Sequence, residues 1–264
     1  MTKLAEIDIE LLTKQWKYWK SVIKALDKTI PRYDLVNFAI SIGKDNKLRQ
    51  MGISALNLQE GMVVLDAGTG PGNIASSIFK KSNVHVIGLD PLTSMLGTAK
   101  NKNKNKNYSL IQGVFEYLPL ADNSVNGIIC SYSFRDAINK NKSLSEFSRV
   151  LKDNGKLVIV DLGKPDFMIF QKLISLYILY IIPIIAKILI SSKLDGNPWK
   201  ALYITYKMNW TNKELKKELS KIFTNIHLKT ILFGGGIVAV AKRRPSRFKL
   251  ATKARRVGEP KASR

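Results

Sequence analysis

The sequence predicts an α/β fold built on a mostly parallel sheet. Short β-branched runs alternate with segments of helical period, which is typical of strand–helix–strand units. A glycine-rich turn directly follows the first of these runs. The last two runs are separated only by the glycine cluster from Gly234 to Gly236, so they predict an antiparallel hairpin that closes the sheet.

Seven runs are expected to form strands. In chain order they are residues 62–66, 84–90, 108–112, 125–131, 156–161, 225–232 and 236–241. Helical segments separate the first five runs, which predicts parallel strands joined by crossover helices. The segment "NKNKNKN" (101–107) has low complexity, so we expect a solvated loop before the third strand.

The composition favours one large domain with additions. A chain of 264 residues that is 45% apolar can bury a sizeable core. The single cysteine, Cys130, excludes an internal disulfide and a multi-cysteine metal site, and the two histidines argue against a histidine-ligated metal. Acidic residues interrupt the first apolar stretch, so no N-terminal signal is visible and we expect a cytoplasmic protein.

A formal net charge of +23 indicates anionic partners, either nucleic acid or anionic lipid, or else a lysine-rich proteome. The sign of the charge does not choose among these. Part of the excess lies in the tail from Lys242 to Arg264, where arginine is concentrated although the rest of the chain uses mainly lysine. A disordered extension, or residues added for expression, explains this tail as well as a binding arm does.

The stretch "VVLDAGTGPGNIA" (63–75) predicts a ligand-binding turn. An apolar strand ends at Asp66 and a helical segment follows the turn, which places the turn at the carboxyl edge of a parallel sheet. Glycines that let a ligand lie against the main chain occupy every second position, at Gly68, Gly70 and Gly72. A dinucleotide fingerprint needs glycine where this chain has Asn73, whereas G-x-G-x-G after an acid is typical of S-adenosyl-L-methionine-dependent methyltransferases.

A second acid supports this interpretation. The next strand, "VIGLD", ends at Asp90, at roughly the chain distance of a ribose-binding acid. Its two carboxylate oxygens can accept hydrogen bonds from both ribose hydroxyls, and acids also suit a ligand that carries an ammonium and a sulfonium. The alternative is a glycine turn that only packs a helix on a strand, with Asp90 capping the next helix.

Longer motifs resemble the UbiE-type family of ubiquinone and menaquinone biosynthesis C-methyltransferases, from about Tyr33 to Lys242. The motifs are "YDLVNFAISIGKDNKLR" (33–49), "DPLTSML" (90–96), "EYLPLADNSVNGIICSYSFRD" (116–136), "RVLKDNGKLVIVDLGKP" (149–165) and "FGGGIVAVAK" (233–242). Many methyltransferases share the glycine loop, but not the blocks at Tyr33 and Arg135. The resemblance implies a Rossmann-like seven-strand methyltransferase sheet with helices on both faces.

The resemblance also implies an S-adenosyl-L-methionine site. Its expected residues are Asp66, Gly68, Thr69, Gly70, Gly72, Asp90, Pro91, Met95, Val114, Phe115 and Ser131. By resemblance, the turn from Gly68 to Gly70 would cradle the methionine part and Asp90 would hold the ribose. Val114 stands where the family has Asp or Asn, so a polar contact to the adenine amine must come from the backbone or elsewhere.

The expected catalytic residues are Arg135 and Asp136. Methyl transfer is an in-line displacement, so the enzyme mainly aligns the reactants and excludes water. By resemblance, Arg135 would stabilise the phenolate or orient a proton-accepting water, with Asp136 positioning it or acting as base. The alternative is a surface pair that caps a helix beginning near Ala137. The family has Asn at position 136, and Asn126 replaces a usual Asp.

The resemblance places four residues on the substrate side, namely Tyr33, Asn37, Tyr203 and Tyr206. Lys207 stands beside them where the family usually has Ser. This departure, together with Asp136, leaves the acceptor less defined than the cofactor.

The segment from Phe167 to Ile190 is more apolar than a helix covering a soluble sheet requires. Lys172, Pro183 and Lys187 interrupt it and leave too short a clean run to span a bilayer. One interpretation is a protected core helix or part of the substrate wall. The other is a segment that lines a portal for a long isoprenoid chain and rests on the membrane, where surface lysines attract anionic lipid. The segment "KQWKYWKSVIKAL" (14–26) suits an interface or a lid over the cofactor.

These observations predict three parts of the chain. An amphipathic helical extension covers residues 1–32, and the methyltransferase domain covers residues 33–242. Within that domain, residues 167–210 form a hydrophobic helical insertion on the substrate side. A basic, disordered tail covers residues 243–264.

The resulting hypothesis is C-methylation of a prenylated quinol or phenol precursor in menaquinone or related quinone biosynthesis. Under this hypothesis the protein forms a homo-oligomer and makes peripheral contact with the inner face of the cell membrane. Alternatives are C- or O-methylation of another small hydrophobic acceptor, nucleic-acid modification, and binding of cofactor or lipid without turnover. Against nucleic acid, "CSYSFRD" (130–136) lacks the Asn-Pro-Pro-aromatic signature of DNA amino methylation.

Overall fold

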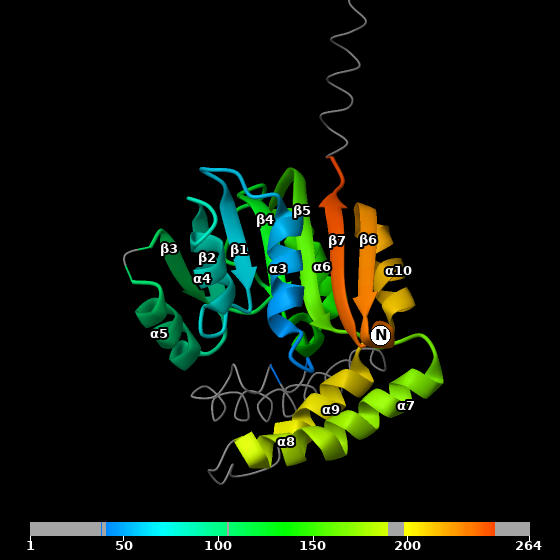
Figure 1. The fold of residues 1–264 in the computed structure, drawn as a ribbon. Helices are drawn as coiled ribbons and strands as arrows, with labels where there is room; N and C mark the ends of the chain where they lie inside the picture. Colours follow the sequence, from blue (N-terminus) through cyan, green and yellow to red (C-terminus); the bar gives the residue numbers. More distant parts are fainter. Residues whose placement is uncertain (1–37, 39–40, 105, 190–197, 246–264) are drawn as a thin grey trace, which may run out of the picture.

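The computed structural model describes residue 38 and residues 41–104, 106–189 and 198–245. Figure 1 shows a central sheet with helices on its two faces and a separate layer of helices along one edge. The predicted extension over residues 1–32, Tyr33 and Asn37 lie outside the described residues, as does the tail from residue 246 onward.

Seven strands form one sheet in the order β3-β2-β1-β4-β5-β7-β6. They are β1 (Val63–Ala67), β2 (His85–Asp90), β3 (Tyr108–Gln112), β4 (Val125–Ser131), β5 (Leu151–Leu162), β6 (Phe223–Ile231) and β7 (Gly236–Arg243). Strands β1 to β5 are parallel, whereas β7 runs antiparallel to both β5 and β6. The predicted parallel sheet with a closing antiparallel pair is confirmed.

Helices cover both faces of this sheet because each one buries an apolar stripe on it. On one face α3 (Asp45–Leu56) and α4 (Asn73–Phe79) pack against β1, β2, β4 and β5. On the other face α6 (Lys140–Val150) and α10 (Asn212–Ile222) pack against the strands through residues such as Phe147. Helix α5 (Thr93–Lys102) connects β2 to β3 and includes the first two residues of the predicted loop 101–107. Asn103 is buried, so the prediction that this whole segment is a solvated loop is wrong.

The helical layer consists of α7 (Met168–Leu176), the π-helical turn η3 (Tyr177–Ile181), α8 (Ile182–Leu189) and α9 (Pro198–Met208). Pro183 explains the π turn, because proline has no N–H to donate to the preceding turn and its ring crowds that turn. A small core of Leu162, Ile178, Ile182, Leu202 and Tyr206 joins this layer to the end of β5. The parallel strands point toward the layer (Figure 1), so it lies along the carboxyl edge of the sheet.

Several boundaries differ from the prediction by a few residues, and two of the differences have a clear reason. Strand β5 begins at Leu151 instead of residue 156, because Leu151 still pairs with Val125 across a register shift. The helix expected near Ala137 is a short 3-10 turn, η2 (Phe134–Asp136), followed by α6, whose N-cap is Asn139. A second 3-10 turn, η4 (Leu232–Gly234), joins β6 to β7.

Candidate active site

The glycine turn between β1 and α4 is bound to the end of β2. The backbone N–H groups of Gly68 and Thr69 both donate to the carbonyl of Leu89, at 2.8 and 2.9 Å. Gly68 has a φ of +75°, and a Cβ there would lie 2.4 Å from Ser133 Oγ. Only glycine fits this position, because both the backbone conformation and the neighbouring side chain exclude any other residue.

Gly72 is required for a different reason. Its φ is +80°, and a Cβ on it would lie 2.6 Å from Asn103 Nδ2 and 3.1 Å from the backbone of Ala99. The close packing of α5 therefore explains this glycine without any ligand. Its contact with a cofactor stays a prediction.

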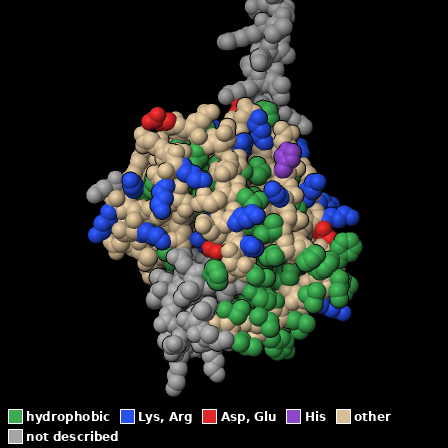
Figure 2. Space-filling view, in the orientation of Figure 1, with side chains coloured by type: hydrophobic (Ala, Val, Ile, Leu, Met, Phe, Trp, Pro, Cys, Tyr) green, Lys and Arg blue, Asp and Glu red, His purple; other side chains and the backbone are tan. Residues whose placement is uncertain are grey.

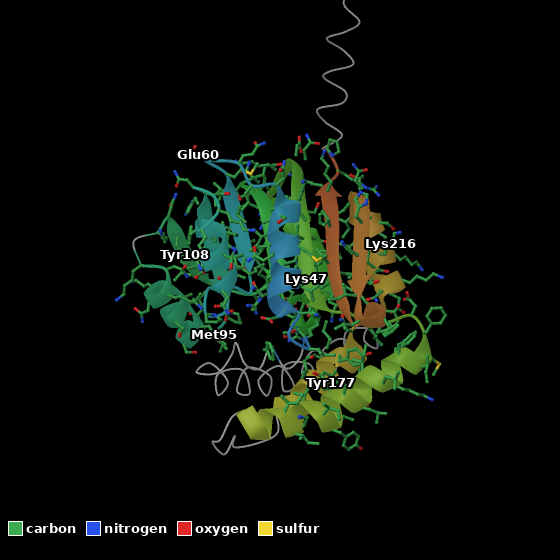
Figure 3. All side chains as sticks on the ribbon, in the orientation of Figure 1. Lys47, Glu60, Met95, Tyr108, Tyr177 and Lys216 are labelled. Atoms are coloured by element: carbon green, nitrogen blue, oxygen red, sulfur yellow. The ribbon has the colours of Figure 1, made fainter. Side chains whose placement is uncertain are left out.

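Hydrogen bonds among three side chains hold the glycine turn in place. Thr69 Oγ1 donates to Asp66 Oδ2 at 2.6 Å, and the hydroxyl of Tyr108 lies 2.6 Å from Thr69 Oγ1. Tyr108 comes from strand β3 and reaches the turn across β2 (Figure 3), where a Cβ on Gly88 would lie 2.6 Å from its hydroxyl oxygen. The sequence analysis missed Tyr108, although a lone glycine within the apolar strand "VIGLD" was a signal of such a close approach.

Two buried carboxylates flank the turn. Burial raises the pKa of Asp66 to about 7; the hydrogen bond from Thr69 opposes this rise and the charge of Asp90 adds to it. Asp90 accepts backbone hydrogen bonds from Gly70 on Oδ2 (2.9 Å) and from Leu92 on Oδ1 (3.0 Å). Burial also raises the pKa of Asp90, and those two backbone bonds oppose the rise.

The arrangement of Asp90 fits both interpretations that the sequence left open. The hydrogen bond that Asp90 accepts from the backbone N–H of Leu92 fits the interpretation of Asp90 as a cap, because it satisfies a backbone N–H just before α5. Each carboxylate oxygen accepts one of these two backbone hydrogen bonds, however, and an ionised carboxylate has about four acceptor positions. Both oxygens therefore retain capacity for ribose hydroxyls.

Unpaired polar atoms at the same edge fit a bound polar ligand. Ser131 ends β4 and is buried, and its hydroxyl has no hydrogen-bond partner among the described residues. Asp66 Oδ1 is likewise without a partner in the described part of the chain. Since buried polar atoms normally have partners, these two are suited to a ligand that supplies donors.

The other expected cofactor residues are distributed around this edge. The ring of Phe115 is buried and would lie 3.2 Å from a Cβ on Gly68. Met95 is buried on α5, and the carbonyl of Pro91 accepts a hydrogen bond from Gln112 at 3.0 Å. Val114 forms an isolated β-bridge with Tyr117. Their contact with a cofactor stays a prediction.

Arg135 lies in a buried cluster of charged residues. Its Nη1 forms an ion pair with Asp161 Oδ1 at 2.6 Å, and its backbone N–H donates to Asp161 Oδ2 at 3.0 Å. Its Nη2 lies 3.6 Å from Asp136 Oδ2, and the two side chains are only 7% and 16% exposed. The alternative of a surface pair that caps a helix is therefore wrong, and Asn139 is the residue that caps α6.

The electrostatics of the cluster follow from burial. Burial raises the pKa of Asp136, and the charge of Arg135 opposes that rise, as do Lys140 and a hydrogen bond from Thr205 of α9. Burial lowers the pKa of Lys140, whereas the nearby acids, first Asp136 and then Asp161, raise it. The cluster thus holds an acid and a base whose burial favours their neutral forms.

Asp161 is a second residue of the candidate site that the sequence analysis missed. It closes an apolar strand at the carboxyl edge, as Asp66 and Asp90 do, and this shared position was a signal in the sequence. Ser133 connects the two halves of the site, since its hydroxyl donates to the carbonyl of Ala67 at 3.0 Å and would be crowded by any Cβ on Gly68. The charged cluster therefore lies beside the glycine turn.

Two tyrosines of α9 were expected on the substrate side. Tyr206 is 1% exposed, and its hydroxyl has no hydrogen-bond partner among the described residues. Tyr203 is partly buried against the same small core, and Lys207 is exposed. Asn126 lies elsewhere and is structural, because its Oδ1 accepts the backbone N–H of Val63 at 2.9 Å.

Comparison with known proteins gives the family. The model of the ubiE/COQ5 methyltransferase family matches residues 13–242. The chain belongs to the ubiE/COQ5 methyltransferase family. It is an S-adenosyl-L-methionine-dependent methyltransferase, as the motifs at Tyr33 and Arg135 predict, and the prediction of family and enzyme class is confirmed.

Individual members of the ubiE/COQ5 family align over most of the chain. The demethylmenaquinone methyltransferase of Paenarthrobacter aurescens is 30% identical over 222 residues, which cover 83% of this chain and 84% of that protein. The ubiquinone/menaquinone biosynthesis C-methyltransferase UbiE of Wigglesworthia glossinidia brevipalpis is 31% identical over 218 residues, covering 79% and 84%.

Solved structures share the fold of this family member. A SAM-dependent methyltransferase from Aquifex aeolicus superposes with a TM-score of 0.51 at 22% identity, covering 74% of this chain and 89% of that chain. The [4+2]-cyclase SpnF superposes with a TM-score of 0.53 at 14% identity, covering 76% and 82%. At such identities the likeness shows the fold alone, and one of these neighbours is a cyclase.

Proposed function

We propose that this enzyme transfers a methyl group to a ring carbon of a prenylated quinol or phenol precursor in menaquinone or related quinone biosynthesis. The observation that carries the proposal is the buried Arg135, which Asp161 holds beside the glycine turn. A cation fixed there suits an acceptor that becomes nucleophilic by losing a phenolic proton. The names of the relatives support the quinone substrate.

The cofactor is proposed to bind at the glycine turn. S-adenosyl-L-methionine supplies an electrophilic methyl group on a sulfonium when it is bound. Asp90 would hold the ribose hydroxyls, the turn from Gly68 to Gly70 would follow the methionine part, and Ser131 would line the floor. Asp66 keeps the turn in place through Thr69.

The chain itself does little covalent chemistry in this proposal. Arg135 stabilises the phenolate of the acceptor, and Asp161 fixes the guanidinium so that it does not have to reorganise. Asp136 orients the water that accepts the ring proton after methyl transfer, a role that an Asn side chain could also fill. Tyr206 and the rest of α9 close the site on the substrate side and exclude water.

The proposal also covers the location of the enzyme, the rest of its acceptor site and its oligomeric state. We expect the enzyme to work in the cytoplasm at the inner face of the cell membrane, where its apolar acceptor is dissolved, and Tyr33 and Asn37 to complete the acceptor site. A homo-oligomer is also part of the hypothesis.

Labelled methyl transfer tests the function. The full chain is incubated with labelled S-adenosyl-L-methionine and, in parallel, with a total lipid extract and with RNA. We expect label in an extractable quinol, none in RNA, and a loss of at least about 100-fold in the Arg135→Ala variant. Label that appears only in RNA, or equal labelling by Arg135→Ala, would overturn the proposal.

A calorimetric titration separates cofactor binding from turnover. We expect the chain to bind S-adenosyl-L-methionine and its demethylated product, and Asp90→Ala to weaken both by at least about 10-fold through the lost charge-assisted bonds. Arg135→Ala serves as the control that still binds. An absence of binding by the folded wild type would contradict the proposed site.

A further inference from the structure

The α7–η3–α8 helix exposes a continuous apolar face. Seven of its apolar side chains are at least 46% exposed, namely Met168, Ile169, Leu173, Leu176, Tyr180, Ile181 and Ile184. Figure 2 shows hydrophobic side chains gathered at the lower right of the molecule, over these helices. An apolar patch of this extent normally marks an interaction site, because exposing it to water is unfavourable.

The opposite side of the same helix is fixed to the enzyme. Ile178 and Ile182 are 1% and 0% exposed and pack against Leu202 and Tyr206 of α9. By length and composition, the stretch Met168–Ile185 could cross a membrane, so the prediction that its apolar run is too short to span a bilayer is wrong. Crossing would remove these packed contacts, so the helix is suited to lie along a surface instead.

An aromatic cluster extends the apolar face at its N-terminal end. The rings of Phe170 and Phe233 stack at 5.1 Å and 7°, and Phe167 packs edge-on against Phe170 at 6.4 Å. Phe167 is 72% exposed and Phe233 is 81% exposed. Leu232 and Phe233 both have left-handed φ values, of 51° and 54°. Two consecutive strained residues that hold a ring in water point to a functional contact.

The charge around this face identifies the partner. The segment from Phe167 to Ile190 contains no acidic residue and includes Lys172 and Lys187, within a chain of net charge +23. Lys172 and Lys207 are exposed. Cations beside a long apolar face match a bilayer with anionic headgroups, whereas a second copy of the chain would bring like charges together.

We propose that this apolar face and the aromatic cluster insert into one leaflet of an anionic bilayer, with the helix parallel to the membrane surface. This inference rests on the proposed function in one respect, because it assumes that the methyl acceptor is a lipid. Because the helical layer lies along the carboxyl edge of the sheet, the inserted face and the catalytic cluster are at the same end of the molecule. An acceptor can then reach Arg135 without crossing open water.

Vesicle flotation tests the proposal with the full chain. Vesicles of phosphatidylcholine alone are compared with vesicles that also contain phosphatidylglycerol. We expect tighter binding to the anionic vesicles, at least about 10-fold weaker binding by the double variant Leu173→Ser, Leu176→Ser, and weaker binding by Lys172→Glu. The matched controls are Tyr117→Ser, at a side chain 71% exposed elsewhere, and Lys80→Glu, which should bind like the wild type.

A depth measurement shows whether the face itself inserts. Cys130 is buried, so a cysteine introduced as Leu173→Cys can be labelled selectively with an environment-sensitive dye in the folded protein. We expect the emission to shift to the blue on anionic vesicles and brominated lipids to quench it, with neither effect for Tyr117→Cys. Equal quenching at both positions, or none at position 173, would overturn the proposal.

Two further results distinguish the docking surface from the enzyme activity. A soluble short-chain quinol, supplied without vesicles, should be methylated equally by the wild type and by the Leu173→Ser, Leu176→Ser variant. Failure of the wild type with this acceptor counts against the proposed function, whereas vesicle binding that survives in the variant counts against the docking surface. A dimer that becomes a monomer in the variant, with no vesicle binding by either, would assign the face to a second copy.

Discussion

Arg135 shows how a single buried residue depends on its neighbours. Its guanidinium is 7% exposed at the side chain and is held by Asp161, which is 2% exposed. A pair of buried charges gives little net stability, but removing one partner leaves the other unpaired in a medium that solvates it poorly. We therefore expect Asp161 to be a positioning residue that acts on the reaction through Arg135.

The Asp161→Asn variant tests this role. We expect kcat to fall at least about 10-fold and the free energy of unfolding to fall by about 3 kcal/mol, because the charge of Arg135 loses its partner. The KM for S-adenosyl-L-methionine should change little. Steady-state kinetics and urea denaturation measure these quantities. Asp136→Asn, which introduces the family's residue, is the comparison and should keep activity within a few-fold; a kcat of Asp161→Asn equal to the wild type would exclude the role.

Tyr108 is expected to act on cofactor affinity alone. In Tyr108→Phe the side chains that hold the glycine turn lose one hydrogen bond while Thr69 stays bonded to Asp66. One such bond contributes about 1 kcal/mol, so the KM for the cofactor should rise about 3- to 10-fold with kcat unchanged. Tyr180→Phe, at an exposed hydroxyl, is the control for removing a phenol oxygen. A changed kcat with unchanged KM would argue against this account.

Asp66 should make stability depend on pH. Its pKa is about 7 in the folded protein and 3.8 by its model-compound value, so the folded state holds a proton that the unfolded state loses between these values. The contribution of Asp66 to stability is therefore full below pH 3.8 and is lost as the pH rises through 7. We expect the free energy of unfolding of the wild type, measured by urea denaturation, to fall relative to that of Asp66→Asn by about 2 kcal/mol between pH 5 and pH 7. Parallel curves for both proteins would refute this.

At the scale of elements, local signals fix where several helices start. Helix α10 begins with a capping box in which Thr211 accepts from the backbone of Glu214 and Glu214 accepts from the backbone of Thr211. Its buried face, including Leu215 and Leu219, packs on the antiparallel end of the sheet. The start of this helix is thus determined by residues next to one another in the sequence.

Removal of that cap has a predictable cost. We expect Thr211→Ala to lower the free energy of unfolding by about 1 kcal/mol, because a backbone N–H at the first turn loses its acceptor. Thermal and urea denaturation measure the change. Ser145→Ala on α6 is the control, since its hydroxyl bonds only to the carbonyl of Asn141 in its own helix. A loss as large in Ser145→Ala would show that the effect is not due to capping.

On the scale of the whole molecule, two regions of unequal packing meet at the carboxyl edge. Strands such as β4 and β5 are buried on both faces, whereas α7 has no buried residue and makes few contacts with the body, such as the stack of Phe170 on Phe233. Regions with few buried contacts open more readily than a core does. The helical layer can therefore adjust to a membrane or an acceptor while the sheet stays rigid.

Hydrogen exchange measures this difference. We expect backbone amides of α7, η3 and α8 to exchange at least about 10-fold faster than those of β4 and β5 in the free protein. Anionic vesicles should slow exchange in the helical layer and leave the sheet unchanged. Equal protection of the layer and the sheet without vesicles would show that the layer is as stable as the core.

Much of the fold could be predicted because its signals are local. Hydrophobic runs of β period, the glycine turn and the glycine cluster before β7 depend on neighbouring residues, and so their pattern predicts seven strands and a closing pair. Asp66 and Asp90 also follow from position, because an acid near the end of an apolar parallel strand must lie at the carboxyl edge of the sheet. The family motifs added the enzyme class.

Only the tertiary structure determined which distant residues meet. Asp161 and Arg135 lie 26 positions apart, and Tyr108 lies 39 positions from Thr69, so no local pattern records these contacts. Packing between elements likewise determines three other features. It buries Arg135, it brings α5 so close to Gly72 that no side chain fits there, and it leaves one side of α7–η3–α8 exposed. The sequence alone determined the sheet, the cofactor turn and the family. Packing determined which charges are buried together and which apolar surface is left facing outward, since both depend on groups brought together only by folding.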